Sequence, residues 1–193
     1  MIARVIHIEG DKSNHAEELG SFEIDYSVFN GVVKQKASDG ISESFKQIIR
    51  ESKDLSHVLI FEDDVKFTSK HSRENWEICK SKLPDDWDVL LGGSYQYDLH
   101  ESQPQDKALI RLADFSSLHC VLINAKCYEH ILSHDTSEVP HIDRWLGKLA
   151  KENKINVYLC NPQIAIQHNG FSRTRGKDVN YDYLLTDKNI LHD

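Results

Sequence analysis

The sequence predicts an α/β fold in which a Rossmann-type mixed sheet is flanked by helices within one compact domain. Short apolar runs alternate with segments of helical periodicity, which is the pattern of an α/β sheet. The length of 193 residues falls in the usual range for one domain. A hydrophobic content of 39% and a charged content of 28% are those of a globular protein. We therefore expect residues 1–193 to form a single domain with a polar tail after about residue 175.

The charge balance argues against two classes of function. Lysine and arginine number 23 against 31 aspartate and glutamate, and non-specific binding to nucleic acid or anionic lipid needs a basic surface instead. No apolar run approaches the length of a membrane-spanning helix, and the first residues lack the apolar core of a secretory leader. We expect a cytoplasmic protein, with peripheral contact at the cytoplasmic face of a membrane left open. The four cysteines form no CxxC pair and are expected to be reduced packing residues.

The first part of the chain contains three expected strands and one helix. Residues 4–8 (RVIHI) and 25–33 (DYSVFNGVV) are rich in β-branched and aromatic residues and predict strands. Residues 41–52 place their apolar side chains on one helical face. Residues 57–61 (HVLIF) are almost continuously apolar, which predicts a buried strand.

The remainder continues the alternation. Residues 69–83 predict a helix that ends before Pro84. Residues 94–114 are polar and irregular, and they predict a hairpin or surface loops. Further strands are expected at residues 87–91, 115–124, 155–159 and 163–167, and further helices at residues 125–133 and 142–152.

Three consecutive acids, Glu62, Asp63 and Asp64, follow the buried strand at residues 57–61. Side chains alternate along a strand, so Glu62 and Asp64 are expected to point one way and Asp63 the other. Two carboxylates at this spacing repel each other unless a cation lies between them, and Mg²⁺ and Mn²⁺ prefer such oxygen ligands. The strand end therefore predicts a metal site, although a solvated acidic turn would carry the same residues.

Other acidic or phosphate-binding folds lack their motifs here. The first strand ends without an acidic pair and no lysine follows residues 163–167, unlike a phosphoacceptor receiver domain. The sequence contains neither GxxxxGK[ST] nor GxGxxG, which argues against a P-loop enzyme and a dinucleotide-binding fold.

The order of several segments resembles glycosyltransferase family 25, the lipopolysaccharide and procollagen galactosyltransferase type, which has a GT-A fold. The resemblance covers roughly residues 2–175. Its central segment is LIFEDDV (residues 59–65), which looks like the metal-binding motif of the family. The other segments are RVIHIEGD (4–11), VFNGV (28–32), GISESF (40–45), WDVLLGG (87–93), PHIDRWLG (140–147) and NPQIAIQHNGFS (161–172).

The resemblance implies a metal-dependent enzyme that uses Mn²⁺ or Mg²⁺ and transfers galactose or another hexose from a UDP-sugar. Asp64 is the expected direct ligand of the metal ion. Glu62 or Asp63 would contact the ion through water or hold the ribose of the donor. GT-A enzymes often add a histidine ligand near the C-terminus, which places His168 in the ligand set, with a surface or structural role as the alternative.

Asp143 is the expected catalytic base, because a carboxylate at a helix start near the anomeric carbon would take the proton of the acceptor. Helix capping explains an aspartate at this position equally well, and His141 is the second candidate base. The resemblance implies inversion at the anomeric carbon. Arg173, Arg175 and Lys177 lie in a polar segment that is either a lid over the diphosphate or a solvated basic loop.

Contacts with the nucleotide-sugar are expected mainly from the ends of the first two strands. Ser44 would contact the ribose or a phosphate, or it is simply a serine of the first helical turn. The full set of expected nucleotide-sugar contacts is His7, Ile8, Glu9, Phe29, Asn30, Ser44, Asp63 and Ser172.

Two alternatives to a glycosyltransferase remain open from the sequence. The first is a non-catalytic binding module on the same GT-A-like fold, and the second is another metal enzyme such as a phosphoesterase. The expected partners are a UDP-sugar donor and a saccharide acceptor, with no nucleic acid and no transmembrane segment.

Overall fold

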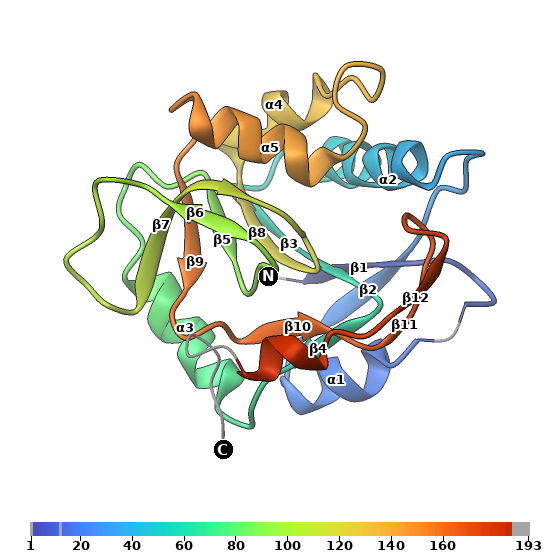
Figure 1. The fold of residues 1–193 in the computed structure, drawn as a ribbon, viewed down its shortest axis with the longest axis horizontal. Coiled ribbons are helices and arrows are strands. Elements are labelled where there is room, and N and C mark those ends of the chain that lie inside the picture. Colours follow the sequence, from blue (N-terminus) through green and yellow to red (C-terminus); the bar gives the residue numbers. More distant parts are fainter. Residues whose placement is uncertain (1, 12, 187–193) are drawn as a thin grey trace.

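A computed structural model describes residues 2–11 and 13–186 of the chain. Eight strands form a mixed sheet in the order β2-β1-β3-β8-β5-β9-β7-β6, flanked by helices, and this confirms the predicted fold class (Figure 1). Only β8 and β7 run against the other strands of the sheet. The strands are β1 (Ala3–His7), β2 (Tyr26–Asn30), β3 (His57–Glu62), β5 (Val89–Leu91), β6 (Tyr97–Leu99), β7 (Leu109–Phe115), β8 (Cys120–Asn124) and β9 (Val157–Cys160).

Helices cover both faces of the sheet. On one face lie α2 (Ala37–Glu51), α4 (Tyr128–Leu132) and α5 (Ile142–Lys151), and on the other lie α1 (His15–Ser21) and α3 (Ser72–Ser81) (Figure 1). Phe45, Ile48 and Leu146 pack on the first face, while Leu19 and Trp76 pack on the second. Burying apolar surface on both faces explains why β3 and β8 are almost continuously apolar.

The parallel register of β2, β1 and β3 gathers their carboxyl ends at one edge of the sheet. His7 pairs with Asn30, and Ile6 pairs with Glu62. Ligands of open α/β sheets bind outside the carboxyl ends of the strands. The edge that carries the three acids is therefore the edge at which a ligand is expected.

Two small sheets lie beside this edge. β4 (Val65–Phe67) pairs antiparallel with β10 (Ala165–Gln167), and β11 (Gly170–Ser172) pairs with β12 (Lys177–Val179). A short 3₁₀ helix, Asp182–Thr186, follows the hairpin. The polar tail expected after about residue 175 is thus structured as far as residue 186, and its last residues, 187–193, lie outside the described part.

Several expected boundaries were wrong. The strand expected at residues 115–124 is split, because Phe115 ends β7 and the chain turns through Ser117 (φ of 91°) before β8 begins. Residues 94–114 do contain the hairpin that was one of two expectations, formed by β6 and β7. The sequence reading missed α1 and β4, which are too short to give a clear periodic pattern.

All four cysteines are buried free thiols: Cys79, Cys120, Cys127 and Cys160. In residues 2–11 and 13–186, none of the helices combines the length and the apolar character needed to cross a bilayer.

Candidate active site

The acidic end of β3 is held together by a glutamine from a distant segment. Nε2 of Gln167, the last residue of β10, donates hydrogen bonds to Oε2 of Glu62 (2.9 Å) and to Oδ2 of Asp64 (2.7 Å). The register of β10 against β4 pairs Gln167 with Val65, which directly follows Asp64. Strand pairing therefore sets one amide group between two carboxylates that would otherwise repel each other.

Both carboxyl groups favour the protonated form more than free side chains do. Loss of solvent, followed by the charges of Asp64, Asp143 and Asp63, raises the pKa of Glu62 well above its usual value. Loss of solvent also raises the pKa of Asp64 to about 6, against the hydrogen bond from Gln167. Oδ1 of Asp64 is buried and has no hydrogen-bond partner among the described residues. A buried oxygen without a partner is an unfilled position for a donor or a cation.

Asp63 points to the other side of the strand end, as the alternation of side chains predicted. Nδ1 of His7 lies 2.5 Å from Oδ2 of Asp63, and the Ser13 hydroxyl donates to the Asp63 carbonyl (2.9 Å). The rings of His7 and His15 are 5.2 Å apart. Asp63 therefore contacts His7 at the end of β1 and Ser13 in the loop that follows, and its side chain points away from those of Glu62 and Asp64.

His168 has a carboxylate partner, and it is Glu18 of α1. Nε2 of His168 lies 2.8 Å from Oε1 of Glu18, whose other oxygen accepts the backbone N–H of Phe67 (2.9 Å). The backbone N–H of His168 donates to the Asp64 carbonyl (2.7 Å). The backbone of His168 is therefore next to the predicted metal site, while its imidazole contacts α1. Within the described residues, no three His, Cys, Asp or Glu side chains are grouped as metal ligands.

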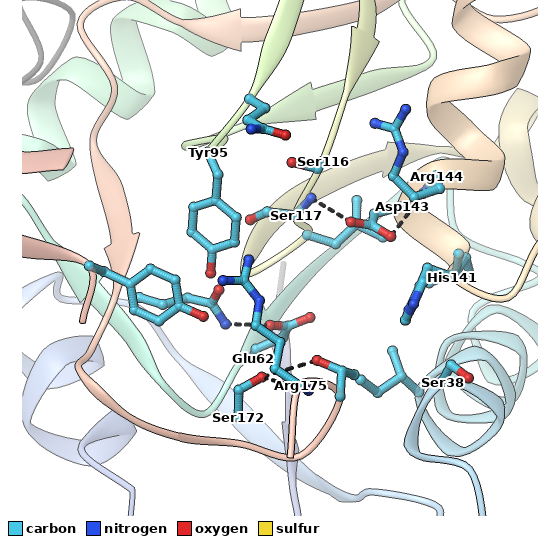
Figure 2. A pocket seen from close by; sticks show the side chains of 17 residues that line it. Ser38, Glu62, Tyr95, Ser116, Ser117, His141, Asp143, Arg144, Ser172 and Arg175 are labelled. Atoms are coloured by element: carbon cyan, nitrogen blue, oxygen red, sulfur yellow. Dashed lines mark hydrogen bonds between the residues drawn. The ribbon is translucent and has the colours of Figure 1, made fainter. Parts of the chain in front are cut away.

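A cavity of about 310 Å³ lies at this edge of the sheet (Figure 2). Glu62, Gln167 and Asp143 all line this cavity, and Asp143 lies in the first turn of α5. The Asp143 charge contributes to the raised pKa of Glu62, although desolvation is the larger cause. Other lining residues come from the loop before β8, the start of α5 and the β11–β12 hairpin: Ser116, Ser117, Leu118, His141, Arg144, Ser172, Thr174 and Arg175.

Asp143 is fixed by two backbone N–H groups. Oδ2 accepts the N–H of Ser117 (2.8 Å), and Oδ1 accepts the N–H of Arg144 (2.8 Å). The N-cap of α5 is His141, so Asp143 is not the capping residue that the sequence allowed as an alternative. The carboxylate is half-buried and lines the cavity, which leaves it in reach of a bound molecule.

The remaining predicted contacts divide into two groups. Of the predicted nucleotide-sugar contacts, only Ser172 lines the cavity. Ser44 is 1% exposed, donates to the Gly40 carbonyl and accepts the N–H of Val32 (2.8 Å each), because α2 begins at Ala37 and places Ser44 inside the helix. The residues at the ends of β1 and β2 share the sheet edge but do not line the cavity: His7, Ile8, Glu9, Phe29 and Asn30.

The sequence reading missed an aromatic stack on the cavity wall. The rings of Tyr95 and Tyr181 are stacked at 4.9 Å, and Tyr95 also stacks on His119 at 5.9 Å. Burial lowers the pKa of His119 to about 4 and raises the pKa of Tyr95. The Arg175 guanidinium lies over both tyrosine rings, 5.8 Å and 6.0 Å from their centres. These residues are far apart in the sequence and follow no periodic pattern, so no local signal brings them together.

No protein-family model matches this sequence, and no curated protein matches it either. Among solved structures, the chain is similar to A197 from STIV, with a TM-score of 0.57 at 11% identity over 92% of each chain. UDP-glucose pyrophosphorylase has a TM-score of 0.45 at 9% identity, over 73% of this chain and 56% of that chain. An inositol-1-phosphate CTP transferase from T. maritima has a TM-score of 0.45 at 14% identity, over 82% and 64% of the two chains. At these identities, the similarity to A197 shows that the chain shares its fold with a solved structure.

Proposed function

We propose that this chain is a metal-dependent glycosyltransferase. It moves galactose or another hexose from a UDP-sugar to a hydroxyl group of a saccharide acceptor, with inversion at the anomeric carbon. The observation that carries this proposal is that Gln167 joins Glu62 and Asp64 at the end of β3, and that Asp143 lines the same cavity as Glu62. One carboxylate pair suited to a cation and one separate carboxylate suited to a base are the groups that such a transfer needs.

The residues present fit a divalent cation, Mn²⁺ or Mg²⁺. Glu62 and Asp64 supply hard oxygen donors, and the pKa values of both are raised. The Oδ1 atom of Asp64 is buried and has no hydrogen-bond partner in the part of the chain that the structure describes. A cation at this point would neutralise charge on the diphosphate leaving group. Two carboxylates leave ligand positions for phosphate oxygens and water, as divalent ions bound to phosphates usually have. The Glu18 contact occupies Nε2 of His168, so His168 would join the ligands through Nδ1 or by giving up that contact.

Asp143 is the group that we assign to the acceptor. Its carboxylate takes the proton of the acceptor hydroxyl while the acceptor oxygen bonds to the anomeric carbon and the bond to the diphosphate breaks. The two backbone N–H groups fix the direction of the carboxylate before the acceptor arrives. They are backbone groups, so they do not take the proton themselves.

One observation favours the second candidate, a non-catalytic binding module on the same fold. The amide of Gln167 already holds the two carboxylates together without a cation. A protein that has lost catalysis would keep such a neutral bridge. In a catalyst, a cation that takes the same two oxygens, Oε2 of Glu62 and Oδ2 of Asp64, must displace these hydrogen bonds.

Binding and turnover of UDP-sugars separate the two candidates. We expect UDP to raise the melting temperature with Mn²⁺ and to have little effect with EDTA, since a ligand that binds the native state stabilises it. UDP-sugar hydrolysis with Mn²⁺ should be lost in Asp64→Ala while the circular dichroism spectrum stays unchanged. Binding of UDP without any turnover would support the binding module. Absence of UDP binding in the presence of Mn²⁺ would overturn the nucleotide-sugar proposal.

A further inference from the structure

The β11–β12 hairpin carries three basic side chains beside the cavity, and their surroundings differ. Arg173 pairs with Asp11 in the loop after β1: Nε and Nη2 each donate a 2.6 Å hydrogen bond to one carboxylate oxygen. Arg175 lies over the stacked rings of Tyr95 and Tyr181 and lines the cavity. Lys177, the first residue of β12, is exposed. Arg173 is therefore neutralised by Asp11, Arg175 faces the cavity, and Lys177 faces solvent.

Two arginines line the cavity, and among the described residues Arg175 has no acidic partner. The other arginine of the lining, Arg144, forms an ion pair with Asp114 (2.9 Å) and donates to the Phe115 carbonyl (2.5 Å). Within residues 2–11 and 13–186, Arg175 forms no ion pair. In Figure 2 its guanidinium points into the cavity, between Tyr95 and Glu62. An arginine in this setting has free N–H donors in the fork geometry that suits phosphate oxygens.

The turn of the hairpin sets the position of Arg175. The N–H of Gly176 donates to the Ser172 carbonyl (2.8 Å), and Gly176 has a φ of 62°, which favours glycine. The Ser172 and Thr174 hydroxyls are 3.1 Å apart and line the same cavity. At the base of the hairpin, Oδ1 of Asn169 accepts the N–H of Tyr181 (2.6 Å). The turn is therefore closed at its tip and anchored at its base.

We propose that the β11–β12 hairpin is an anion-binding flap, in which Arg175 binds a phosphate or diphosphate group with the Ser172 and Thr174 hydroxyls. The Asp11–Arg173 pair holds the flap over the cavity. Arg175 provides the positive charge that binds the anion, whereas Arg173 fixes the hairpin to the loop after β1. The two arginines therefore have different roles, although they are only two residues apart. This inference deepens the proposed function, because a nucleoside diphosphate is the anion that such a transferase would bring to the cavity.

The test uses inorganic pyrophosphate as the probe, with EDTA present so that no cation contributes. We expect calorimetry to show that Arg175→Ala weakens pyrophosphate binding by about 10- to 100-fold, the usual worth of a hydrogen-bonded charge. Arg175→Lys should fall between the wild type and Arg175→Ala, since a lysine keeps the charge but not the fork. Lys177→Ala is the matched control on the same hairpin. It should bind pyrophosphate within about twofold of the wild-type affinity, because a solvated charge contributes little.

The attachment is tested by proteolysis. Asp11→Asn removes the charge that pairs with Arg173, so brief trypsin digestion should cleave the Arg175–Gly176 bond faster than in the wild type. Pyrophosphate should also slow cleavage of the Arg173–Thr174 bond in the wild type and fail to slow it in Arg175→Ala, which keeps this tryptic site but loses the one after residue 175. Equal cleavage in Asp11→Asn and the wild type would overturn the role of the pair.

Failure of this inference is distinguishable from failure of the proposed function. If Arg175→Ala binds pyrophosphate as well as the wild type does, the flap is not an anion site, whatever the enzyme does with UDP-sugars. If pyrophosphate binding depends on Arg175 but no UDP-sugar is ever turned over, the anion site stands and the glycosyltransferase proposal falls.

Discussion

The backbone N–H of Ser117 donates a 2.8 Å hydrogen bond to the carboxylate of Asp143. Ser117 reaches this position with a φ of 91°, in a region that residues with a side chain seldom adopt. The strained residue lies in the turn between β7 and β8, and Asp143 lies in the first turn of α5. Backbone strain of this kind persists only where the surrounding structure holds it, and it is often found at functional sites.

Asp143→Asn tests the assignment of the base. The side-chain oxygen of an asparagine still accepts the Ser117 N–H, so the fold should be retained, but the amide does not take a proton. We expect sugar transfer to fall by about 10²- to 10⁴-fold, the usual worth of a general base. Asp39→Asn is the matched control, because Asp39 is also an acid in the first turn of a helix and does not line the cavity. Retained transfer in Asp143→Asn would remove Asp143 from the mechanism.

His119 gives the stability a defined dependence on pH. Its ring accepts the Ser117 hydroxyl at Nδ1 (2.5 Å) and donates to the Ala165 carbonyl at Nε2 (3.1 Å), and burial lowers its pKa from 6.5 to about 4. Between these two pH values the unfolded chain binds more protons at this histidine than the folded chain. The folded state therefore loses stability as the pH falls from about 6.5 to about 4.

Urea unfolding of wild type and His119→Gln measures this contribution. We expect the free-energy difference between the two proteins to shrink by about 1.4 kcal/mol per pH unit below 6.5, because glutamine has no proton to gain. His71→Gln is the control for replacing a histidine by glutamine at an exposed position. A pH-independent difference for His119→Gln would mean that the buried imidazole is not held neutral.

The sequence predicts the acidic end of β3 better than it predicts the walls of the cavity. The acidic end of β3 was predictable, because a buried apolar run and the alternation of side chains are local properties of the chain. The separation of Asp63 from Glu62 and Asp64 followed from the same alternation, and the structure confirms it. Gln167 was not predictable as their partner, since only the β10–β4 register brings it there.

The same reason explains the errors at Ser44 and at residues 115–124. Ser44 seemed to open a helix because residues 41–52 have the clear apolar periodicity, but α2 begins at Ala37 with a polar turn. Residues 115–124 contain a continuous stretch of strand-forming residues, and tertiary contacts override that propensity at Ser117, where the chain turns. Apolar periodicity indicates which face of a helix or strand is buried, but it does not indicate the polar turns at which that element begins or ends.

Gln167→Ala tests whether the glutamine and a cation compete for the same carboxylates. In EDTA the variant should lose about 1.5–3 kcal/mol of stability, because the carboxylates lose hydrogen bonds that involve a charged group. Mn²⁺ should then raise its melting temperature more than that of the wild type, since no hydrogen bonds to the amide have to be broken. Gln47→Ala is the control, as Gln47 donates a hydrogen bond to the Glu43 carboxylate within α2 and does not line the cavity. An equal Mn²⁺ shift in Gln167→Ala and the wild type would contradict competition.

Gly93→Ala tests whether the close approach of β10 to the main sheet holds the site together. A Cβ atom at Gly93 would lie 1.9 Å from the Ala165 carbonyl oxygen and 3.0 Å from Nε2 of His119, so β10 would have to move and Gln167 would move with it. We expect a loss of about 1–3 kcal/mol, as for other overpacked core positions, together with weaker UDP binding. Gly20→Ala is the matched control, because Gly20 lies in α1 with open space around its Cβ position and should gain up to about 1 kcal/mol. Thermal melting and UDP titration of the two variants measure both effects, and normal UDP binding in a destabilised Gly93→Ala would separate the packing of β10 from the function of the cavity.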